Sequence, residues 1–468
     1  MQERRQSKMV TKDKMEQILQ RAQATGGDFA ELFFEDRDDT VFKSKDSQIS
    51  GVTSQHIYGV GLYLLKGTSS VYVYSNDTSF HGLMGLAETA AELIPVSQRE
   101  HRPNRAITFS KQKNRCPNPI EIYPGTVDTK RKIAVVRDME KAARSAGPIV
   151  PMLNVEYYDN VQHVRIVNSE GLDTEDTRAF SRVRLVGTVE WKGKSLYKFN
   201  DFVKPQGFEA FLNNDYTGFA RQTILKMEES LKAKTVSPCV VPVVFDAGDC
   251  GVFWHESCGH NLEATSAKTG CFAGMDGKQI ASPKVTLIDD GCVPGLCGSE
   301  AIDDEGHPTQ KNILIQNGIL TARLCDRKGA RELGCESTGS GRRQNYTFAP
   351  VARMHNTYLA AGEDDDEEMI RSIDNGLFVT ELGGGSSGSN FSIAVKSGYW
   401  IRDGKLAEPV GNMTLSGNSL DIIKRVDRVG STLKLDLGGG FCGADSGLVQ
   451  TTNYEPRFRV SSMRVGGM

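Results

Sequence analysis

The residues best suited to chemistry lie in one short segment, FWHESCGHNLE, at positions 253–263. Its two histidines, His255 and His260, are five positions apart, and Glu256 directly follows the first. Neutral imidazoles bind zinc well, and a catalytic zinc takes about three protein ligands and keeps one position open for water. A glutamate that lies beside the ligands without binding the metal can take the proton from zinc-bound water. The segment therefore predicts a hydrolytic zinc site in which Glu256 is the general base.

The spacing of the two histidines sets a condition on the helix that carries them. On a regular helix, at about 100° per residue, His255 and His260 would point about 140° apart and could not bind one ion. A π-bulge, with its i→i+5 hydrogen bond, would return them to one face, and such bulges cluster at functional sites. Gly259 would relieve crowding in the distorted turn. The alternative is that both histidines are ordinary helix residues.

A third metal ligand is not evident from the segment alone. Glu263 lies eight residues after His255, within reach of the same ion. Cys442 lies in LGGGFCGADSG, where glycines permit a tight backbone that presents the thiol, and zinc would deprotonate it. His307 and His355 are further candidates, and the chemistry of these side chains leaves all four open.

Composition excludes several classes of protein. The 468 residues carry a net charge of -3, with 38% hydrophobic and 25% charged residues, as in a soluble protein of two or three domains. A nucleic-acid partner would need a basic excess that is absent. No segment approaches the roughly 18 apolar residues of a membrane span. The polar start has no apolar signal segment. We therefore expect a cytoplasmic protein without membrane association, whose ten cysteines are mostly reduced and buried.

The hydrophobic pattern predicts an α+β chain in three blocks. Two small N-terminal α+β domains, at 10–96 and 121–233, are joined by a polar, basic linker at 97–120. A mainly β, glycine-rich domain with the motif helix follows at 237–468. The periodicities predict helices at 11–24, 83–93, 129–146 and 207–233. They predict strands at 30–34, 41–44, 56–65, 70–74, 155–167, 178–191, 240–246, 285–289, 312–316, 391–395 and 398–401.

Five segments of the third block resemble the TldD/PmbA family of metallopeptidases, its TldD branch in particular. They are HESCGHNLE (255–263), IDDGCVPGLCGSEAIDDEGHPTQKNILIQNGIL (288–320), TGSGRRQNYTFAPVARMHNTYL (338–359), GGGSSGSNFSIAVKSGYWI (383–401) and LKLDLGGGFCGADSG (433–447). The resemblance implies a metallopeptidase C-terminal domain in which His255, His260 and Cys442 bind Zn²⁺ and Glu256 is the catalytic base. It also implies a dimer, either with itself or with a PmbA (TldE) relative that lacks the motif.

The expected activity is zinc-dependent cleavage of unfolded or extended peptides, in peptide maturation or degradation. Two other readings stay open: a binding protein of the kind labelled "modulator of DNA gyrase", and a zinc hydrolase of a non-peptide amide. An intact Glu256 argues against a pure binder, which has no use for a general base. The segment 264–275 departs from the family pattern in its charged residues, which leaves substrate preference open.

Three consecutive glycines, Gly383, Gly384 and Gly385, precede the predicted strand at 391–395. Glycine permits another backbone to approach closely. No charged or aromatic cluster flanks the zinc motif as a specificity pocket. We therefore expect a peptide to bind as an added strand beside these glycines, held by main-chain hydrogen bonds.

Overall fold

Two long antiparallel strands and a shorter third strand follow the first helix of the chain. The computed structural model describes residues 10–95, 100, 105–234, 236–435 and 439–466. Two predicted features are only partly described. Gly438, in the glycine-rich segment before Cys442, lies outside these ranges, and so do residues 97–104 of the predicted linker except residue 100. The strands are β1 (Phe29–Lys45), β2 (Gln48–Lys66) and β3 (Ser69–Ser75). The predicted strands 30–34 and 41–44 are thus parts of one continuous strand.

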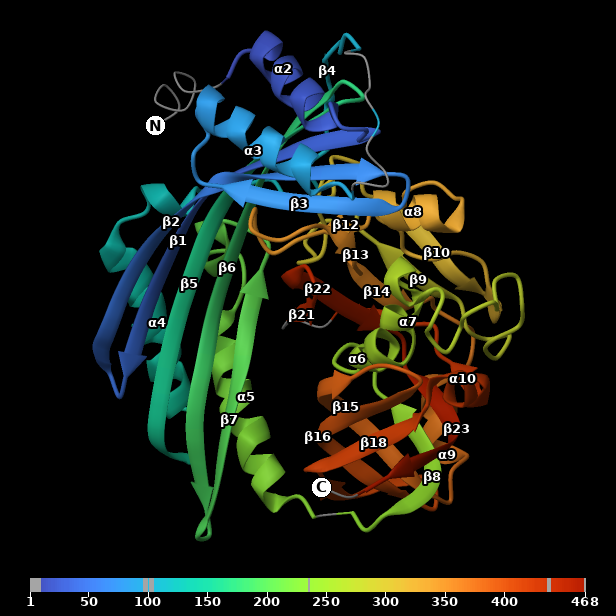
Figure 1. Cartoon of the computed structure of the whole chain (residues 1–468). Coiled ribbons are helices and arrows are strands. Elements are labelled where there is room, and N and C mark those ends of the chain that lie inside the picture. The colour runs from blue at the N-terminus through green and yellow to red at the C-terminus, as the bar shows by residue number, and fades with distance from the viewer. Residues whose placement is uncertain (1–9, 96–99, 101–104, 235, 436–438, 467–468) are drawn as a thin grey trace.

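The second block continues the same sheet. Strands β5 (Ile149–Asn168), β6 (Leu172–Trp191) and β7 (Lys194–Lys204) follow as antiparallel neighbours. Because β1 pairs with β5 along its length, the first two blocks form one seven-stranded sheet (Figure 1). Strand β4 (Ser110–Lys111), from the predicted linker, pairs with β6 in parallel.

Helices cover one face of this sheet in two pairs. Helices α2 (Lys12–Gln23) and α3 (Phe80–Leu93) pack on one end, and α4 (Thr129–Arg144) and α5 (Tyr216–Lys232) pack on the other. Side chains of a strand alternate between its faces. Accordingly Leu32 of β1 packs under the helices, whereas the next residue, Phe33, packs with Ile302 of the C-terminal half. The sheet is therefore a layer between two helix pairs and the remainder of the chain.

A closed barrel forms the part of the C-terminal half farthest from α2 and α3 (Figure 1). Strand β15 pairs with both β8 and β16, so the order β15-β8-β23-β18-β16 returns to its starting strand. Its interior belongs to the largest apolar core of the protein. The strands of this sheet are β8 (Cys239–Phe245), β15 (Asn375–Ser386), β16 (Asn390–Arg402), β17 (Lys405–Val410), β18 (Met413–Asn418), β19 (Val426–Val429) and β23 (Phe458–Val465).

A second sheet of short strands lies between the barrel and the helix-covered sheet. It contains β9 (Leu287–Asp290), β10 (Lys311–Gln316), β11 (Ile319–Leu320), β14 (Asn356–Leu359), β20 (Lys434–Leu435), β21 (Gly440–Ala444) and β22 (Gly447–Glu455). A two-stranded ribbon, β12 (Gly341–Arg342) and β13 (Val351–Ala352), adjoins it. Besides the motif helix, the short α-helices of this half in the described residues are α8 (Arg327–Leu333), α9 (Asp366–Arg371) and α10 (Ser419–Ile422). The chain therefore has the predicted α+β class, with a mainly β third block.

One predicted helix begins later than its sequence indicates. We expected a continuous helix over 207–233, but the structure has a short 3₁₀ helix, Phe208–Phe211, and then α5 from Tyr216. Asp215 caps the N-terminus of α5, because its carboxylate accepts the backbone N–H of Gly218 at 2.7 Å. Asparagine and aspartate favour such turns, so the segment between the two helices breaks the run.

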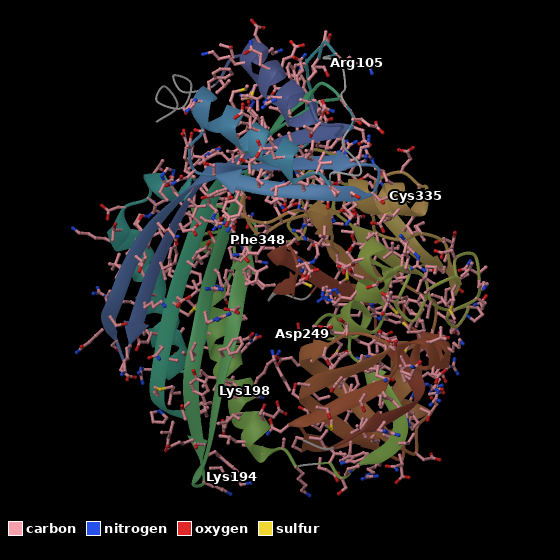
Figure 2. All side chains as sticks on the ribbon, in the orientation of Figure 1. Arg105, Lys194, Lys198, Asp249, Cys335 and Phe348 are labelled. Atoms are coloured by element: carbon pink, nitrogen blue, oxygen red, sulfur yellow. The ribbon has the colours of Figure 1, made fainter. Side chains whose placement is uncertain are left out.

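Contacts of α5 and β7 join the helix-covered sheet to the barrel. Lys226 forms an ion pair with Asp249 at 3.2 Å, and Lys198 donates to the Lys396 carbonyl at 3.4 Å (Figure 2). The linker adds another contact, since Asn118 donates to the carbonyls of Leu296 and Ser299. Its described part is therefore packed against the third block.

Among the helices of the described ranges, none has the length and apolar composition needed to cross a bilayer.

Candidate metal centre

The motif helix follows β8 and contains the distortion that the histidine spacing predicts. Helix α6 (Val252–Trp254) leads into a π-helical turn, His255–Gly259, and then into α7 (His260–Leu262). The N–H of His260 donates to the carbonyl of His255, which is the i→i+5 hydrogen bond of a π-bulge. The extra residue brings both imidazoles to one face, with ring centroids 4.8 Å apart. The predicted π-bulge is confirmed.

Gly259 has a packing role that differs from the expected one. Its backbone angles, φ -52° and ψ -56°, are ordinary for a helix, so the turn itself does not require glycine. A Cβ at this position would lie 2.0 Å from the sulfur of Met354. The glycine therefore lets the segment after β13 pack directly against the turn that carries both histidines.

A hairpin far along the chain brings the thiol of Cys442 to the two imidazoles. Cys442 lies on β21 opposite Val449 of β22, and its side chain is buried. Its sulfur is 3.2 Å from Nε2 of His255 and 3.2 Å from Nε2 of His260. The cysteine is 187 and 182 residues away from these histidines in sequence. The fold thus assembles the three side chains from two distant segments.

These three donors have the spacing that a zinc ion needs. Their ligand atoms all lie within 4.8 Å of one another. A tetrahedral zinc with ordinary bond lengths would hold its nitrogen and sulfur ligands roughly 3.5 Å apart. The observed 3.2 Å separations are close to this distance. Two imidazoles and one thiolate also leave a fourth position, as a catalytic zinc requires. The donor set fits Zn²⁺ in both chemistry and size.

The electrostatics of the site favour the ligand form of the cysteine. Burial by itself would raise the pKa of the Cys442 thiol, but hydrogen bonds and charge from His255 and His260 outweigh it and lower that pKa to about 4. Burial opposes charge on His260, whereas Cys442 and Glu263 raise the pKa of its imidazole to about 10. Both shifts favour the thiolate form of Cys442, which is the form that binds zinc.

The other candidates for the third ligand lie elsewhere. Glu263 contacts the opposite nitrogen of His260, with its Oε2 3.1 Å from Nδ1, so it contacts the ring on the side away from Cys442. The ring of His307 forms a hydrogen bond with the carbonyl of Pro308. Buried His355 lies 3.6 Å from an Asp289 oxygen. Within the described ranges, His255, His260 and Cys442 are the one group of three or more His, Cys, Asp or Glu residues whose ligand atoms converge.

Glu256 lies beside the last of the three glycines, Gly385. Gly383, Gly384 and Gly385 are the last part of β15 rather than a turn before the next strand. A Cβ on Gly385 would lie 2.9 Å from Cγ of Glu256, whereas one on Gly384 would have no atom within 4 Å. Gly385 therefore makes room for the glutamate side chain, and Gly384 faces open space.

Two buried charged residues that the sequence analysis did not single out hold this site together. The carboxylate of Glu455, at the end of β22, accepts the N–H of Cys250 at 3.0 Å, just before the motif helix. Arg353, which follows β13, donates to the carbonyl of Cys442 at 2.5 Å. Their partners are 205 and 89 residues away, so no local pattern could indicate these contacts.

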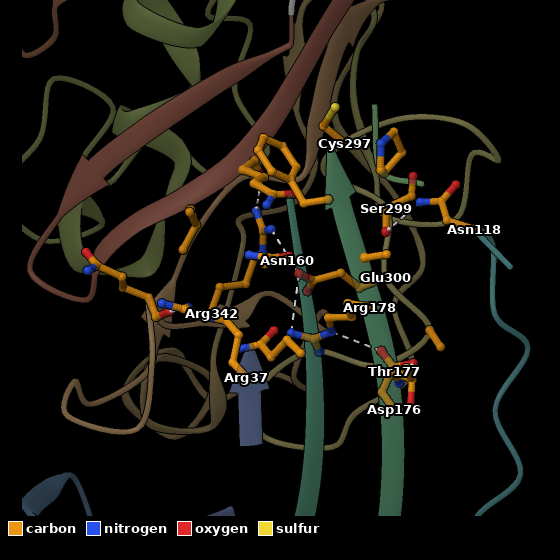
Figure 3. A pocket seen from close by; sticks show the side chains of 18 of the residues that line it. Arg37, Asn118, Asn160, Asp176, Thr177, Arg178, Cys297, Ser299, Glu300 and Arg342 are labelled. Carbon is orange, nitrogen blue, oxygen red and sulfur yellow. Dashed lines mark hydrogen bonds and ion pairs between the residues drawn. The ribbon is translucent and has the colours of Figure 1, made fainter. Parts of the chain in front are cut away.

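A cavity of about 280 Å³ lies between the helix-covered sheet and the Cys442 hairpin. Phe441 lines it, whereas the sulfur of its neighbour Cys442 contacts the two histidines. Arg178 and Arg342 both pair with Glu300 at this interface, at 3.4 and 3.2 Å (Figure 3). The ion pair between Arg178 and Glu300 therefore joins the two halves at this cavity.

Family models of known proteins match three parts of the chain. Models of the PmbA/TldA metallopeptidase match as domain 1 over residues 30–94, the central domain over 122–228 and the C-terminal domain over 238–467. A Buchnera aphidicola protein named metalloprotease TldD homolog is 29% identical over 94% of this chain and 93% of its own length. A Methanothermobacter thermautotrophicus metalloprotease is 32% identical over 90% and 92% of the two chains.

Solved structures share the fold at lower identity. TldE from Thermococcus kodakarensis superposes with a TM-score of 0.74 at 19% identity, over 97% of this chain and all of that one. A Thermotoga maritima protein described as a candidate modulator of a DNA gyrase has a TM-score of 0.75 at 20% identity, over 98% and 100% of the two chains. The solved structures thus share the fold. The family models and the relatives of nearly full length show that the chain belongs to the PmbA/TldD family of metallopeptidases.

Proposed function

We propose that this metallopeptidase is a zinc enzyme in which His255, His260 and Cys442 bind the metal and Glu256 is the general base. The observation that carries the proposal is the convergence of two imidazoles and one thiol, spaced for zinc, beside a glutamate on the same π-helical turn. A Saccharolobus solfataricus relative, 26% identical over 71% of this chain, is named a zinc metalloprotease. A protein that only binds a partner would have no need of this arrangement.

Each residue has a distinct task in the proposed reaction. Zinc, when bound, would supply a Lewis acid that acidifies water and polarises the carbonyl of the scissile bond. Glu256 accepts the proton of the attacking water and returns it to the leaving amine. Glu263 fixes the orientation of His260 through Nδ1, as carboxylates commonly do for zinc-bound histidines.

We propose that the substrate is an extended peptide that pairs with the end of β15. Strand β16 occupies one edge of β15 as far as Ser386, whereas β8 pairs only with Leu377–Val379 on the other edge, as far as the described residues go. The segment that contains the three glycines therefore has an edge available for a backbone. Because Gly385 touches Glu256, a peptide paired here would lie beside the general base.

The zinc requirement is tested by stripping the purified protein with a chelator and restoring the metal. Hydrolysis of an unfolded protein should disappear in the stripped sample and return with about one equivalent of Zn²⁺. Undiminished hydrolysis after complete removal of zinc would contradict the proposal, as would no hydrolysis of any unfolded chain by the fully loaded protein.

Strand pairing is tested with one good peptide substrate and its N-methylated forms. Methylation removes a backbone donor, so methyl groups near the cleaved bond should slow cleavage, and the folded form of a substrate protein should resist it. Equal cleavage of folded and unfolded chains, or indifference to methylation, would rule out this mode of binding.

We further propose a dimer, formed with a second copy or with a relative that lacks the motif. Edge strand β7 exposes two aromatic side chains, Tyr197 and Phe199, at 62% and 55%. Exposed edges and aromatic side chains are surfaces that a partner can cover. Sedimentation should give a dimer at micromolar concentration, and a monomer both alone and with any relative would contradict this. We also propose that the protein is cytoplasmic, and cell fractionation would test this location.

A further inference from the structure

Arg353 lies between the motif helix and the Cys442 hairpin, and its side chain is fully buried. Its guanidinium donates to the carbonyl of Cys442 at 2.5 Å, to the Ser446 hydroxyl at 3.0 Å and to the Gly447 carbonyl at 2.9 Å. All three acceptors belong to the hairpin that carries the thiol. One buried side chain therefore fixes both strands of this hairpin and the turn between them.

The same guanidinium faces the motif helix on its other side. Its Nε lies 3.9 Å from Oε1 of Glu263, a carboxylate that is itself buried. The other oxygen of that carboxylate lies 3.1 Å from Nδ1 of His260. Arginine cannot lose its proton in a protein, and a buried charge without a counterion is strongly unfavourable. The pairing of Arg353 with Glu263 therefore offsets part of the cost of burying both charges.

We infer that Arg353 and Glu263 act as one positioning unit, which holds His260 and Cys442 at the separation that zinc requires. The inference rests on the proposed zinc function. His260 is held through Glu263, and Cys442 is held through its own carbonyl. The unit joins ligands that are 182 residues apart in sequence and lie on separate elements. Neither residue binds the metal.

Loss of this unit should weaken metal binding more than it weakens folding. Removing an outer residue that orients a ligand typically lowers metal affinity by about 10–100-fold. Arg353→Gln leaves Glu263 without its counterion and the hairpin acceptors without their donors. Arg353→Lys keeps the charge but lacks the planar fork that reaches several acceptors at once. We therefore expect a loss within that range for both variants, larger for glutamine.

Arg342 provides a matched control in the same half. It is also buried, and it donates to the carbonyls of Met354 at 2.6 Å and Gln450 at 2.8 Å, with Glu300 as its counterion (Figure 3). Gln450 belongs to the same hairpin and Met354 packs against Gly259, but the hydrogen bonds and ion pair of Arg342 reach neither Cys442 nor Glu263. Arg342→Lys should lower the unfolding temperature and leave the zinc dissociation constant within about twofold.

The experiment measures two properties of the full chain. Competition with a chromophoric chelator gives the zinc dissociation constant, and the absorption spectrum of the Co²⁺-substituted protein reports the geometry around the thiolate. Arg353 variants should lose affinity and change the cobalt spectrum, while Arg342→Lys keeps both. If Arg353→Gln does not fold, Glu263→Gln in the wild-type and Arg353→Lys backgrounds tests the same unit, because the two losses should not add.

The outcomes separate the inference from the proposed function. Wild-type affinity and an unchanged spectrum in the Arg353 variants would overturn the positioning role. Equal losses of affinity in the Arg353 and Arg342 variants would also overturn it, because they would show a structural effect only. A wild-type chain that binds no zinc would instead overturn the proposed function, and the inference with it.

Discussion

In the helix-covered sheet, strands pair mostly with neighbours in sequence, apart from β1 with β5, whereas in the C-terminal half several distant pairings add to the local hairpins. β1 pairs with β2, and β6 pairs with both β5 and β7, through tight connections. In contrast, β8 pairs with β15 and β23, and β14 pairs with β22. Such distant pairings bring the Cys442 hairpin to the motif helix. Local sequence patterns therefore build the scaffold, whereas contacts between distant segments build the site.

The largest expected effect concerns chemistry in the C-terminal half. Glu256→Gln keeps the size of the side chain but cannot take up a proton, so hydrolysis should fall by a factor of about 10² or more. Zinc content should stay the same, because Glu256 is not among the converging ligands. Initial rates on an unfolded substrate, with metal analysis of the same samples, check this. A fully active variant would show that another group is the base.

A smaller effect should come from one methyl group next to that glutamate. Gly385→Ala places a Cβ 2.9 Å from Cγ of Glu256, so the glutamate must move. A displacement of about 1 Å in a catalytic group can cost roughly 100-fold, and we expect a loss of about tenfold or more. Gly85→Ala, in α3, is the control, since its Cβ would meet no atom within 4 Å and it lies outside the proposed site. Equal rates of hydrolysis for the two variants would show that Gly385 does not position Glu256.

In the helix-covered sheet, we expect changes in stability without changes in chemistry. Leu19 of α2 is fully buried, so Leu19→Ala should lower the free energy of unfolding of this region by about 2–5 kcal/mol. Leu93 of α3 is 56% exposed, and Leu93→Ala should change the free energy of unfolding by about 0.5 kcal/mol at most. Denaturant unfolding checks both, and turnover below the transition should match the wild type. Reduced turnover of the folded Leu19→Ala protein would show that the helix-covered sheet also affects the chemistry.

The sequence predicted most of what depends on local periodicity. Helix α2 lies within the predicted 11–24, and β8 matches the apolar run at 240–246 to within one residue at each end. The π-bulge was also predictable, because two histidines five apart can bind one ion only on a distorted helix. The boundary at 97–120 stays a prediction, although β1 and β5 from its two sides share one sheet.

The rest of the site depends on contacts that no local pattern contains. Residue chemistry left Cys442 as one of four candidates for the third ligand, and only the pairing of β22 with β14 and β21 places it beside the histidines. Arg353 and Glu455 are charged residues, which sequence reasoning assigns to the surface. Their burial follows from partners such as Glu263 and the backbone of Cys250, which only the fold brings near.

In the proposed site, three residues from two distant segments hold one zinc ion. This assignment is tested by metal analysis of the wild type and of Cys442→Ala, purified and dialysed side by side. Cys258→Ala is the control, because Cys258 is a buried thiol of the motif helix whose sulfur faces Ser257. We predict about one zinc per chain in the wild type and in Cys258→Ala, and almost none in Cys442→Ala. Equal zinc in all three proteins, or none in the wild type, would contradict the account.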